Sequence, residues 1–268
     1  MELTGRTAVV TGGGNGIGRE VVLELLRRGA RVAAVDLRED GLAETADLAG
    51  AGERLSTHAV DVTDAAAVAA LLEAVLTSHG SVDALLNVAG IIQPFVRVAD
   101  LDQAVVDRVM AVNFHGVVGT VRAFLPLLLE RPEAGIVNVS SMGALVPVPG
   151  QAVYGASKAA VMLFTEALYA ELRDTPVAVT VVFPGGVSTH ITDNSGVSIP
   201  SAGEEAGSSM SLTTPQDAGR QVVDGLADGS FRVVIGKDAR AMDVLSRISP
   251  RRATDTVAKR MARLLDRA

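Results

Sequence analysis

Two side chains with complementary proton chemistry stand four residues apart: Tyr154 and Lys158, in the stretch Tyr-Gly-Ala-Ser-Lys. If this stretch is helical, residues four apart share one face, so the phenol and the ammonium lie side by side. A nearby positive charge favours the phenolate and lowers the pKa of a tyrosine from its ordinary value of about 10. Such a tyrosine can take a proton from an alcohol, or return one to a ketone, as hydride moves. The alternative is a surface pair that merely shares a helical turn.

The composition limits the classes of protein to which this chain can belong. Hydrophobic residues make up 48% of the 268 residues and aromatic residues only 3%, so the core must be aliphatic, which suits strands buried on both faces. A formal net charge of -7 argues against non-specific nucleic-acid binding. The chain has no cysteine, which excludes a thiol nucleophile, and its four histidines are scattered, so we expect no catalytic metal.

The amino-terminal residues show no export signal. Met1 to Arg6 lead directly into a strand pattern and lack the charged and then apolar organisation of a signal peptide. No apolar stretch approaches the roughly 20 residues that a membrane-spanning helix needs. We therefore expect a cytoplasmic protein without membrane insertion.

Short valine-rich runs alternate with longer segments whose apolar residues recur every three or four positions, as at Val21, Leu25 and Leu26. This rhythm predicts a single α/β domain over residues 1–268, with a doubly wound parallel sheet of about seven strands and helices on both faces. The ligand of such a sheet lies beyond the carboxyl ends of its strands. The predicted strands are Thr7–Thr11, Arg31–Asp36, Leu55–Val60, Ala84–Asn87, Gly135–Val139, Val177–Phe183 and Arg232–Ile235.

Two segments depart from this alternation. Residues 188–214 are rich in Ser, Gly and Thr and follow a strand end, which predicts a substrate lid over the ligand crevice or, alternatively, a disordered insertion. Residues 250–268 are basic, and their apolar members have the spacing of an amphipathic helix: Val257, Met261, Leu264 and Leu265. Such a helix can bind a membrane surface, although packing on its own domain or on a neighbouring subunit is the more ordinary use.

A glycine-rich stretch, Thr11 to Gly18, follows the first predicted strand and precedes a helix that we expect to begin near Arg19. Glycines let the backbone approach a pyrophosphate, whose charge then lies at the amino end of that helix; a plain turn is the alternative. Asp36 ends the second predicted strand, where a carboxylate accepts hydrogen bonds from the adenosine ribose and repels a 2′-phosphate. This favours NAD over NADP, although Arg38 could reach such a phosphate, and Asp36 could instead cap the next helix.

With these segments in place, the chain resembles the short-chain dehydrogenase/reductase family over essentially its whole length, and the resemblance implies a Rossmann fold. Thr11 to Gly18 matches the family's TGxxxGxG loop, and Asn15 stands where NADP-using members often carry Arg or Lys. Asp61-Val62 resembles the pair that contacts the adenine ring. Asn-Val-Ala-Gly at 87–90 resembles the family's NNAG motif, with Val88 replacing its second Asn.

The residues at 184–189 resemble the family's PG motif, in which Val187 and Thr189 hold the nicotinamide carboxamide. Together these motifs imply a set of cofactor-binding residues. They are Gly12, Gly14, Asn15, Gly16, Ile17, Gly18, Asp36, Leu37, Asp61, Val62, Asn87, Ala89, Gly90, Tyr154, Lys158, Pro184, Gly185, Val187 and Thr189.

The resemblance also implies the catalytic residues: Asn113, Ser141, Tyr154 and Lys158. Ser141 lies thirteen residues before the tyrosine, which is the family's spacing and selects it over Ser140. Tyr154 is the expected general base in oxidation and general acid in reduction, and Lys158 the group that lowers its pKa and binds the nicotinamide ribose. Ser141 is expected to donate a hydrogen bond to the substrate oxygen, and Asn113, in a long helical pattern, to hold a water that connects Lys158 to solvent.

The expected substrate wall is mostly apolar, with no Arg or Lys placed against a substrate carboxylate. It consists of Gln93, Phe95, Met142, Ala144, Val148, Gln151 and Gly186, together with Ser141 and Tyr154. The predicted function is therefore NAD-dependent hydride transfer with a mid-sized, fairly apolar secondary alcohol or ketone. The alternatives are an NADPH-dependent ketone or 3-oxoacyl-thioester reductase and a non-catalytic NAD-binding regulator. Family members commonly form tetramers or dimers through the helices that contain Asn113 and Tyr154, so we expect a homotetramer or a homodimer.

Overall fold

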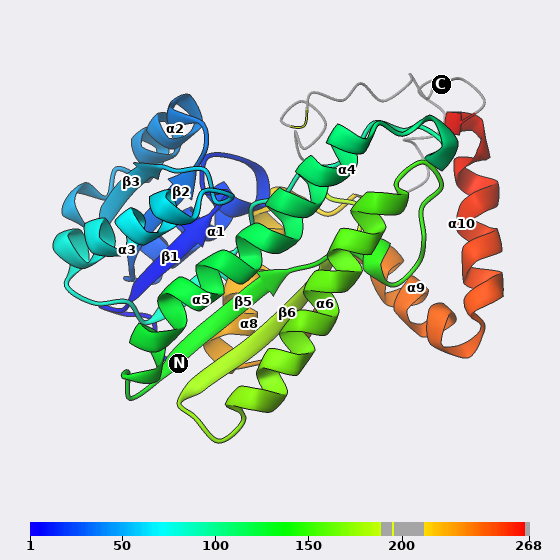
Figure 1. Ribbon diagram of the computed structural model, residues 1–268. Coiled ribbons are helices and arrows are strands. Elements are labelled where there is room, and N and C mark those ends of the chain that lie inside the picture. The colour runs from blue at the N-terminus through cyan, green and yellow to red at the C-terminus, as the bar shows by residue number, and fades with distance from the viewer. Residues whose placement is uncertain (189–194, 196–211, 266–268) are drawn as a thin grey trace.

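The computed structural model describes residues 1–188, 195 and 212–265, and in this part of the chain seven parallel strands form one sheet in the order β3-β2-β1-β4-β5-β6-β7 (Figure 1). The strands are β1 Thr7–Thr11, β2 Arg31–Asp36, β3 Leu55–Ala59, β4 Ala84–Asn87, β5 Ala134–Val139, β6 Val177–Pro184 and β7 Arg232–Ile235. Strand β1 pairs with β2 on one side and β4 on the other, so the strand order reverses there. A ligand crevice is expected beyond the carboxyl ends of β1 and β4.

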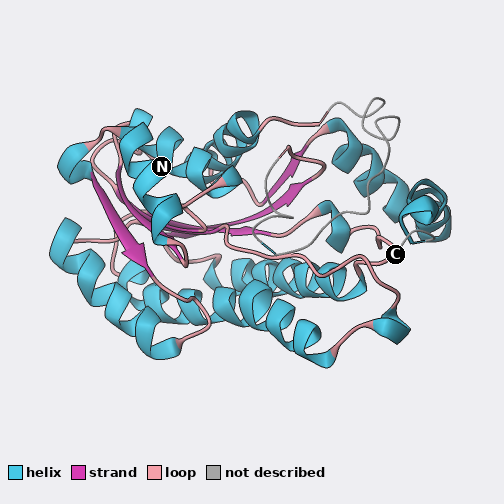
Figure 2. Ribbon diagram, turned by 90° about the horizontal axis from the view of Figure 1, so that it is seen from above, coloured by secondary structure: helices cyan, strands magenta, loops and turns pink. Residues whose placement is uncertain are grey.

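Helices cover both faces of the sheet, as predicted (Figure 2). Ala8 and Val10 of β1 pack into one core cluster with α1 and α8, whereas Val9 packs into a second cluster with α3, α5 and α6. This alternation follows from the two-residue period of a strand. The helices that pack near the sheet are α1 Gly16–Arg27, α2 Glu39–Ala49, α3 Ala65–His79, α4 Gln103–Met110, α5 Gly116–Leu129, α6 Ala152–Leu172 and α8 Pro215–Asp228.

Some element boundaries differ from the prediction. Helix α1 begins at Gly16 rather than near Arg19, so part of the glycine-rich stretch already belongs to the helix. Strand β3 ends at Ala59 instead of Val60, while β5 starts one residue earlier, at Ala134, and β6 includes Pro184. The earlier start of α1 brings its amino end, and the partial positive charge there, closer to the carboxyl edge of β1.

The expectation that the chain has no long apolar stretch is wrong for one segment. Helices α4 and α5 join through a π-helical turn, Ala111–His115, into the continuous run Gln103–Leu129, whose most apolar window has a mean hydropathy of 1.4. By length and composition, this run is a candidate membrane span. In the structure α5 packs against α3 and the sheet, and Phe124 and Leu128 are fully buried in the core. A helix that lies in the core of a domain passes the same test of length and hydropathy.

Most of the expected lid, 188–214, lies outside the described residues, but both of its ends are held. Ser188 N donates to Thr213 O at 3.1 Å, and Thr213 N donates to Gly186 O at 2.9 Å. Ser195 Oγ accepts a hydrogen bond from Ile92 N at 3.0 Å, which fixes one point of this segment beside the end of β4.

The predicted carboxyl-terminal helix is present as α10, Pro250–Leu265, which packs on α9, Lys237–Ile248, at the edge of the molecule (Figure 1). Ala253 is buried, whereas the side chain of Arg251 is almost fully exposed.

Candidate active site

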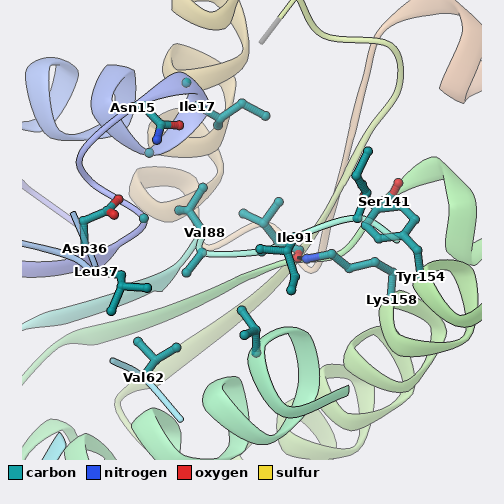
Figure 3. Close-up of a pocket in the computed structure, with 18 of the residues that line it drawn as sticks. Asn15, Ile17, Asp36, Leu37, Val62, Val88, Ile91, Ser141, Tyr154 and Lys158 are labelled. Atoms are coloured by element: carbon teal, nitrogen blue, oxygen red, sulfur yellow. Dashed lines mark hydrogen bonds between the residues drawn. The ribbon is translucent and has the colours of Figure 1, made fainter. Parts of the chain in front are cut away.

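A cavity of about 560 Å³ opens at the carboxyl edge of the sheet, and most of the predicted site residues line it. Figure 3 shows Asp36, Leu37 and Val62 at one end of it and Ser141, Tyr154 and Lys158 at the other. The predicted residues that line the cavity are Gly12, Asn15, Gly16, Ile17, Gly18, Asp36, Leu37, Asp61, Val62, Ala89, Gly90, Ser141, Tyr154, Lys158, Pro184, Gly185, Gly186 and Val187. Thr189 lies outside the described residues.

Two glycines of the loop stand where a side chain would collide with the backbone. Gly12 has a φ of +74°, and a Cβ there would come within 2.8 Å of Ala89 N. A Cβ on Gly18 would lie 1.9 Å from Gly12 O, inside the van der Waals radius. Thr11 Oγ1 accepts hydrogen bonds from Val88 N and Ala89 N, which joins this loop to the end of β4. The close approach of these two backbones builds a cradle of the kind that accepts a pyrophosphate.

Asp36 is fixed by the backbone around it. Its Oδ2 accepts from Gly14 N at 2.9 Å, and its Oδ1 accepts from Arg38 N at 3.1 Å. A Cβ on Gly14 would lie 2.9 Å from this carboxylate, so glycine is what lets the two segments meet. Gly14 therefore supports Asp36 and does not itself line the cavity within the described part of the chain.

The guanidinium of Arg38 is bound to an acidic neighbour. Its Nη2 lies 2.6 Å from an Asp40 carboxylate oxygen, and its Nε donates to the other oxygen at 3.1 Å. This contact, together with the backbone N–H of Gly41, lowers the pKa of Asp40 to about 2. Both side chains are exposed, so the pair is a weak restraint, but it draws Arg38 toward Asp40.

Tyr154 lies in the first turn of α6, and its hydroxyl is hydrogen-bonded to Ser141. The pKa of Tyr154 is raised above its ordinary value, because burial disfavours the phenolate more than the Ser141 hydrogen bond favours it. This direction is opposite to the lowered pKa that the spacing of Tyr154 and Lys158 predicts. Sequence spacing places the lysine near the tyrosine but does not show how much water either group loses.

Lys158 is buried, and its Nζ donates to Val139 O at 3.0 Å. Burial lowers the pKa of this lysine to about 8. A Cβ on Gly90 would lie 3.0 Å from Nζ, so the glycine at the end of β4 keeps the ammonium accessible from the cavity. A partly desolvated ammonium with free donors suits the hydroxyl groups of a ribose.

Asn113 lies in the π-helical turn and is completely buried. Its Oδ1 accepts from Ile91 N at 2.9 Å, and its Nδ2 donates to Ile91 O and to Ser157 Oγ. The expected position in a helical segment is confirmed as a local widening of the helix, a feature found at functional sites. Its side-chain amide is therefore bonded inside the protein through both its oxygen and its nitrogen.

Several residues expected to contact ligands have other positions. Asn87 bonds to Asn138 and Thr120 inside the protein, and Gln93 is fully buried with its amide bonded to backbone groups. Among the described residues, the expected contacts that do not line the cavity are Gly14, Asn87, Gln93, Phe95, Asn113, Met142, Ala144, Val148 and Gln151. The periodic pattern placed them near the correct strand ends but gave no direction for each side chain.

Other residues of the site were not predicted. Ile91, Ile92, Arg108 and Val112 line the cavity, the last two from the run Gln103–Leu129, which includes Asn113. Asp238, in the first turn of α9, accepts a hydrogen bond from Gly186 N at 2.7 Å, and a Cβ on Gly185 would lie 2.3 Å from its Oδ1. The paired glycines at 185 and 186 are a sequence signal for such a close neighbour, but they do not say which residue it is.

The sequence is similar to those of known oxidoreductases. The profile of the family described as short chain dehydrogenase matches residues 6–198. The oxidoreductase SadH of Mycobacterium tuberculosis is 39% identical over 254 residues, which are 91% of each chain. The 3beta-hydroxysteroid dehydrogenase 2 of Eggerthella lenta is 35% identical over 191 residues, or 70% of this chain and 74% of that protein.

Solved structures show the same architecture. A short chain dehydrogenase/reductase from Burkholderia phymatum, in complex with NAD, has a TM-score of 0.85 and 28% identity over 95% of this chain and 97% of its own. A 3-ketoacyl-(acyl-carrier-protein) reductase from Brucella melitensis, complexed with NADH, has a TM-score of 0.76 and 29% identity over 87% of this chain and 96% of its own. The family profile covers well over half of the sequence, and the chain therefore belongs to the short chain dehydrogenase family of oxidoreductases.

Proposed function

We propose that this chain is an NAD-dependent oxidoreductase that transfers a hydride between the nicotinamide and a mid-sized, fairly apolar secondary alcohol or ketone. The observation that carries the proposal is that one cavity joins Asp36 and the glycine cradle to Ser141, Tyr154 and Lys158. A nucleotide bound at Asp36 and the glycine cradle would extend toward Tyr154 and Ser141. There a proton donor and a hydrogen-bond donor lie side by side.

In the proposed reaction the bound nicotinamide accepts or supplies the hydride. Tyr154 takes the hydroxyl proton of the alcohol during oxidation and returns it during reduction. Ser141, hydrogen-bonded to Tyr154, orients the substrate oxygen and stabilises the charge that develops on it. Lys158 binds the ribose and supplies a positive charge near the phenol.

The raised pKa of Tyr154 sets a condition on this mechanism. A buried neutral phenol is a competent acid for ketone reduction, but oxidation needs a phenolate at the working pH. A cation next to the phenol lowers its pKa, and the oxidised nicotinamide is positively charged. We therefore propose that the ammonium of Lys158 offsets the effect of burial, aided by the positive charge that an oxidised nicotinamide would supply when bound.

The preference for NAD is supported by Asp36 and the Arg38–Asp40 pair. The Asp36 carboxylate lies in the cavity wall at the end of β2, where it accepts hydrogen bonds from ribose hydroxyls and repels a phosphate. Arg38 also lines the cavity and is a candidate for a phosphate contact, but its guanidinium is paired with Asp40.

The substrate class follows from the apolar residues beside the catalytic end, Ile91, Ile92 and Val187. Named relatives include a 3beta-hydroxysteroid dehydrogenase and a 1-deoxy-11-beta-hydroxypentalenate dehydrogenase, the latter 38% identical over 198 residues. Both names describe oxidation of a hydroxyl on a carbon skeleton.

We further propose a cytoplasmic homotetramer or homodimer that buries α5 and α6, since Leu163 of α6 is 66% exposed in the isolated chain.

The proposal is tested with a panel of secondary alcohols and ketones, monitored by NADH absorbance with NAD(H) and NADP(H) in parallel. We expect turnover with several apolar members and a preference for NAD(H). Binding of NADH without turnover across the panel would instead indicate a non-catalytic NAD-binding protein, and a preference for NADP(H) would contradict the role given to Asp36.

A further inference from the structure

We infer that Gln93 is a positioning residue of the active site, which caps the helix that carries Tyr154 and so fixes the phenol in the cavity. This inference rests on the proposed function of Tyr154. Gln93 lies in the segment after β4, sixty residues before the first turn of α6. Its side chain is fully buried and does not line the cavity within the described part of the chain, so it acts through Tyr154 rather than on a ligand.

The first turn of α6 takes its cap from this distant residue. Within the described part of the chain, the N-cap residue Gln151 makes no side-chain hydrogen bond to that turn. Gln93 Oε1 accepts instead from Val153 N at 2.8 Å and from Tyr154 N at 3.1 Å. These are two of the N–H groups that a helix leaves without partners at its start.

Further hydrogen bonds hold Gln93 in place through its side-chain amide and through its backbone. Its Nε2 donates to Gly150 O at 3.0 Å, and its backbone oxygen accepts from Gln151 Nε2 at 2.7 Å. Only a neutral amide supplies an acceptor for the helix and a donor for Gly150 in the same plane. A methionine fills the space without either group, and a glutamate keeps the acceptor but adds a charge.

A second brace holds the other backbone group of Tyr154. Asn113 Nδ2 donates to Ser157 Oγ at 3.0 Å, and that hydroxyl donates to Tyr154 O at 2.7 Å. Asn113 is itself bonded to Ile91 through both backbone groups of that residue. The short segment from Ile91 to Gln93 therefore fixes Tyr154 N on one side and Tyr154 O on the other.

This arrangement also explains why an amide rather than a carboxylate suits the position. The amino end of α6 carries a partial positive charge that favours a phenolate in its first turn. A neutral cap satisfies the N–H groups without cancelling this field, whereas an anion would oppose it. The charged group that lines the cavity on the same helix is Lys158, one turn on, and it is unchanged in the variants below.

The composition of the chain allows a direct measurement of the phenol. The sequence has two tyrosines, Tyr154 and Tyr169, and no tryptophan, so in a Tyr169→Phe background the tyrosinate absorbance reports Tyr154 alone. Stopped-flow pH jumps record this absorbance before the protein unfolds. Tyr154 is half-buried at the cavity wall, and we expect Gln93→Met to let the first turn fray, so that more of the phenol is exposed to water and its pKa falls toward the ordinary value. We expect Gln93→Glu to move the pKa in the opposite direction, upward.

Turnover supplies the second readout. A displacement of about 1 Å in a reacting group can cost 10²-fold in rate, so we expect Gln93→Met to lower kcat by about 10- to 100-fold. NADH affinity, measured by fluorescence, should stay within about twofold because the nucleotide cradle lies on other segments. The matched control is Thr165→Val, which removes a buried hydrogen bond from Asn138 to the same helix at a residue that does not line the cavity. It should lose stability but keep kcat and the Tyr154 pKa.

The outcomes separate the two proposals. If Gln93→Met and Gln93→Glu leave the Tyr154 titration where Thr165→Val leaves it, Gln93 is an ordinary core residue and the inference is wrong. If the wild-type chain turns over no member of the alcohol and ketone panel, the proposed function fails, while the titration still decides whether Gln93 positions the phenol.

Discussion

The two ends of the cavity are built in different ways. The nucleotide end is built mainly from the contiguous stretch Thr11 to Gly18, which meets the segment after β4, and from Asp36 at the end of β2; it depends on backbone groups and on the absence of side chains. The chemical end brings together residues from β5, α6 and the π-helical turn, braced by Gln93 and Ser157. Binding is therefore a local property of one loop and one strand end, whereas catalysis depends on hydrogen bonds between distant segments.

This difference predicts that substitutions at the two ends of the cavity have different effects. Changes at the nucleotide end should alter affinity or cofactor choice, and changes at the chemical end should alter turnover more than binding. The expected effects on binding or turnover decrease from Lys158 through Asp36 to Asp238, and a histidine pair outside the cavity should affect stability alone.

Lys158→Met is the exception that links the ends, because Lys158 is expected to touch both the ribose and the proton path. We expect turnover to fall by about 10²- to 10⁴-fold, the usual range for acid–base machinery, and NAD affinity to fall as well. Steady-state rates and a nucleotide titration measure both. Turnover near the wild-type value would show that the ammonium has no part in the reaction.

The same variant should be more stable at neutral pH. The folded pKa of Lys158 is about 8 against an ordinary value of 10.5, so below about pH 8 the folded protein holds a charged amine that burial disfavours. Wild-type stability should therefore rise with pH between about 8 and 10.5, and Lys158→Met should lack this rise. Loss of the donor to Val139 O offsets part of the gain. Urea unfolding at several pH values checks both expectations.

Asp36→Ala should act on the nucleotide end alone. Hydrogen bonds to a charged group contribute about 1.5–3 kcal/mol, so NAD affinity should fall by about 10- to 100-fold while NADP affinity is unchanged or improved. The kcat at saturating NAD should stay close to wild type. Equal loss for both nucleotides would mean that the carboxylate supports the loop through Gly14 rather than reading the ribose.

Asp238→Ala removes the acceptor for Gly186 N and should loosen the loop at 185–187. A neutral control, Asp243→Ala, removes a carboxylate from the outer part of α9, where it pairs with Arg232 and Arg247. We expect the KM for NAD to rise several-fold in the first variant and to be unchanged in the second. If both variants behave alike, the effect belongs to α9 as a whole and not to the loop.

The smallest effect is expected far from the cavity, where Ser56 Oγ lies 2.8 Å from Nε2 of both His58 and His79. Burial lowers the pKa of both imidazoles, so the folded state binds protons less readily than the unfolded state. Their contribution to stability is complete above about pH 6.5 and is lost as the pH falls through the folded pKa values. A His58→Gln/His79→Gln double variant should show a weaker decline in urea midpoint between about pH 7 and 5.

The nucleotide end could largely be predicted from the sequence because its information is local. A glycine loop after a strand, and a carboxylate at the end of the next strand, fix the positions of these residues and indicate the role proposed for them. The parallel sheet and the two layers of helices follow from the alternation of strand and helix patterns, whereas the strand order was not predicted. Asn15, Asp36 and Leu37 accordingly line the cavity where they were expected.

The chemical end could be predicted only as a list of residues. Gln93 is a polar residue of the kind expected in a substrate pocket, but its side-chain amide points into the protein. There it accepts hydrogen bonds from the first turn of α6, whose N-cap residue Gln151 makes no side-chain hydrogen bond to that turn. The pKa of Tyr154 depends on how much water the fold removes, and Asp238 reaches Gly186 from 52 residues away. No local or periodic pattern in the sequence predicts these three features, because each depends on which segments the tertiary fold brings together.

The account depends on Tyr154 as the group that exchanges the proton. In Tyr154→Phe, NADH binding should match the wild type within about twofold, while turnover of the best alcohol of the panel falls by about 10²- to 10⁴-fold across the whole pH range. A Tyr154→Phe protein that binds NADH and keeps wild-type turnover would contradict the assignment and move the proton chemistry to another group.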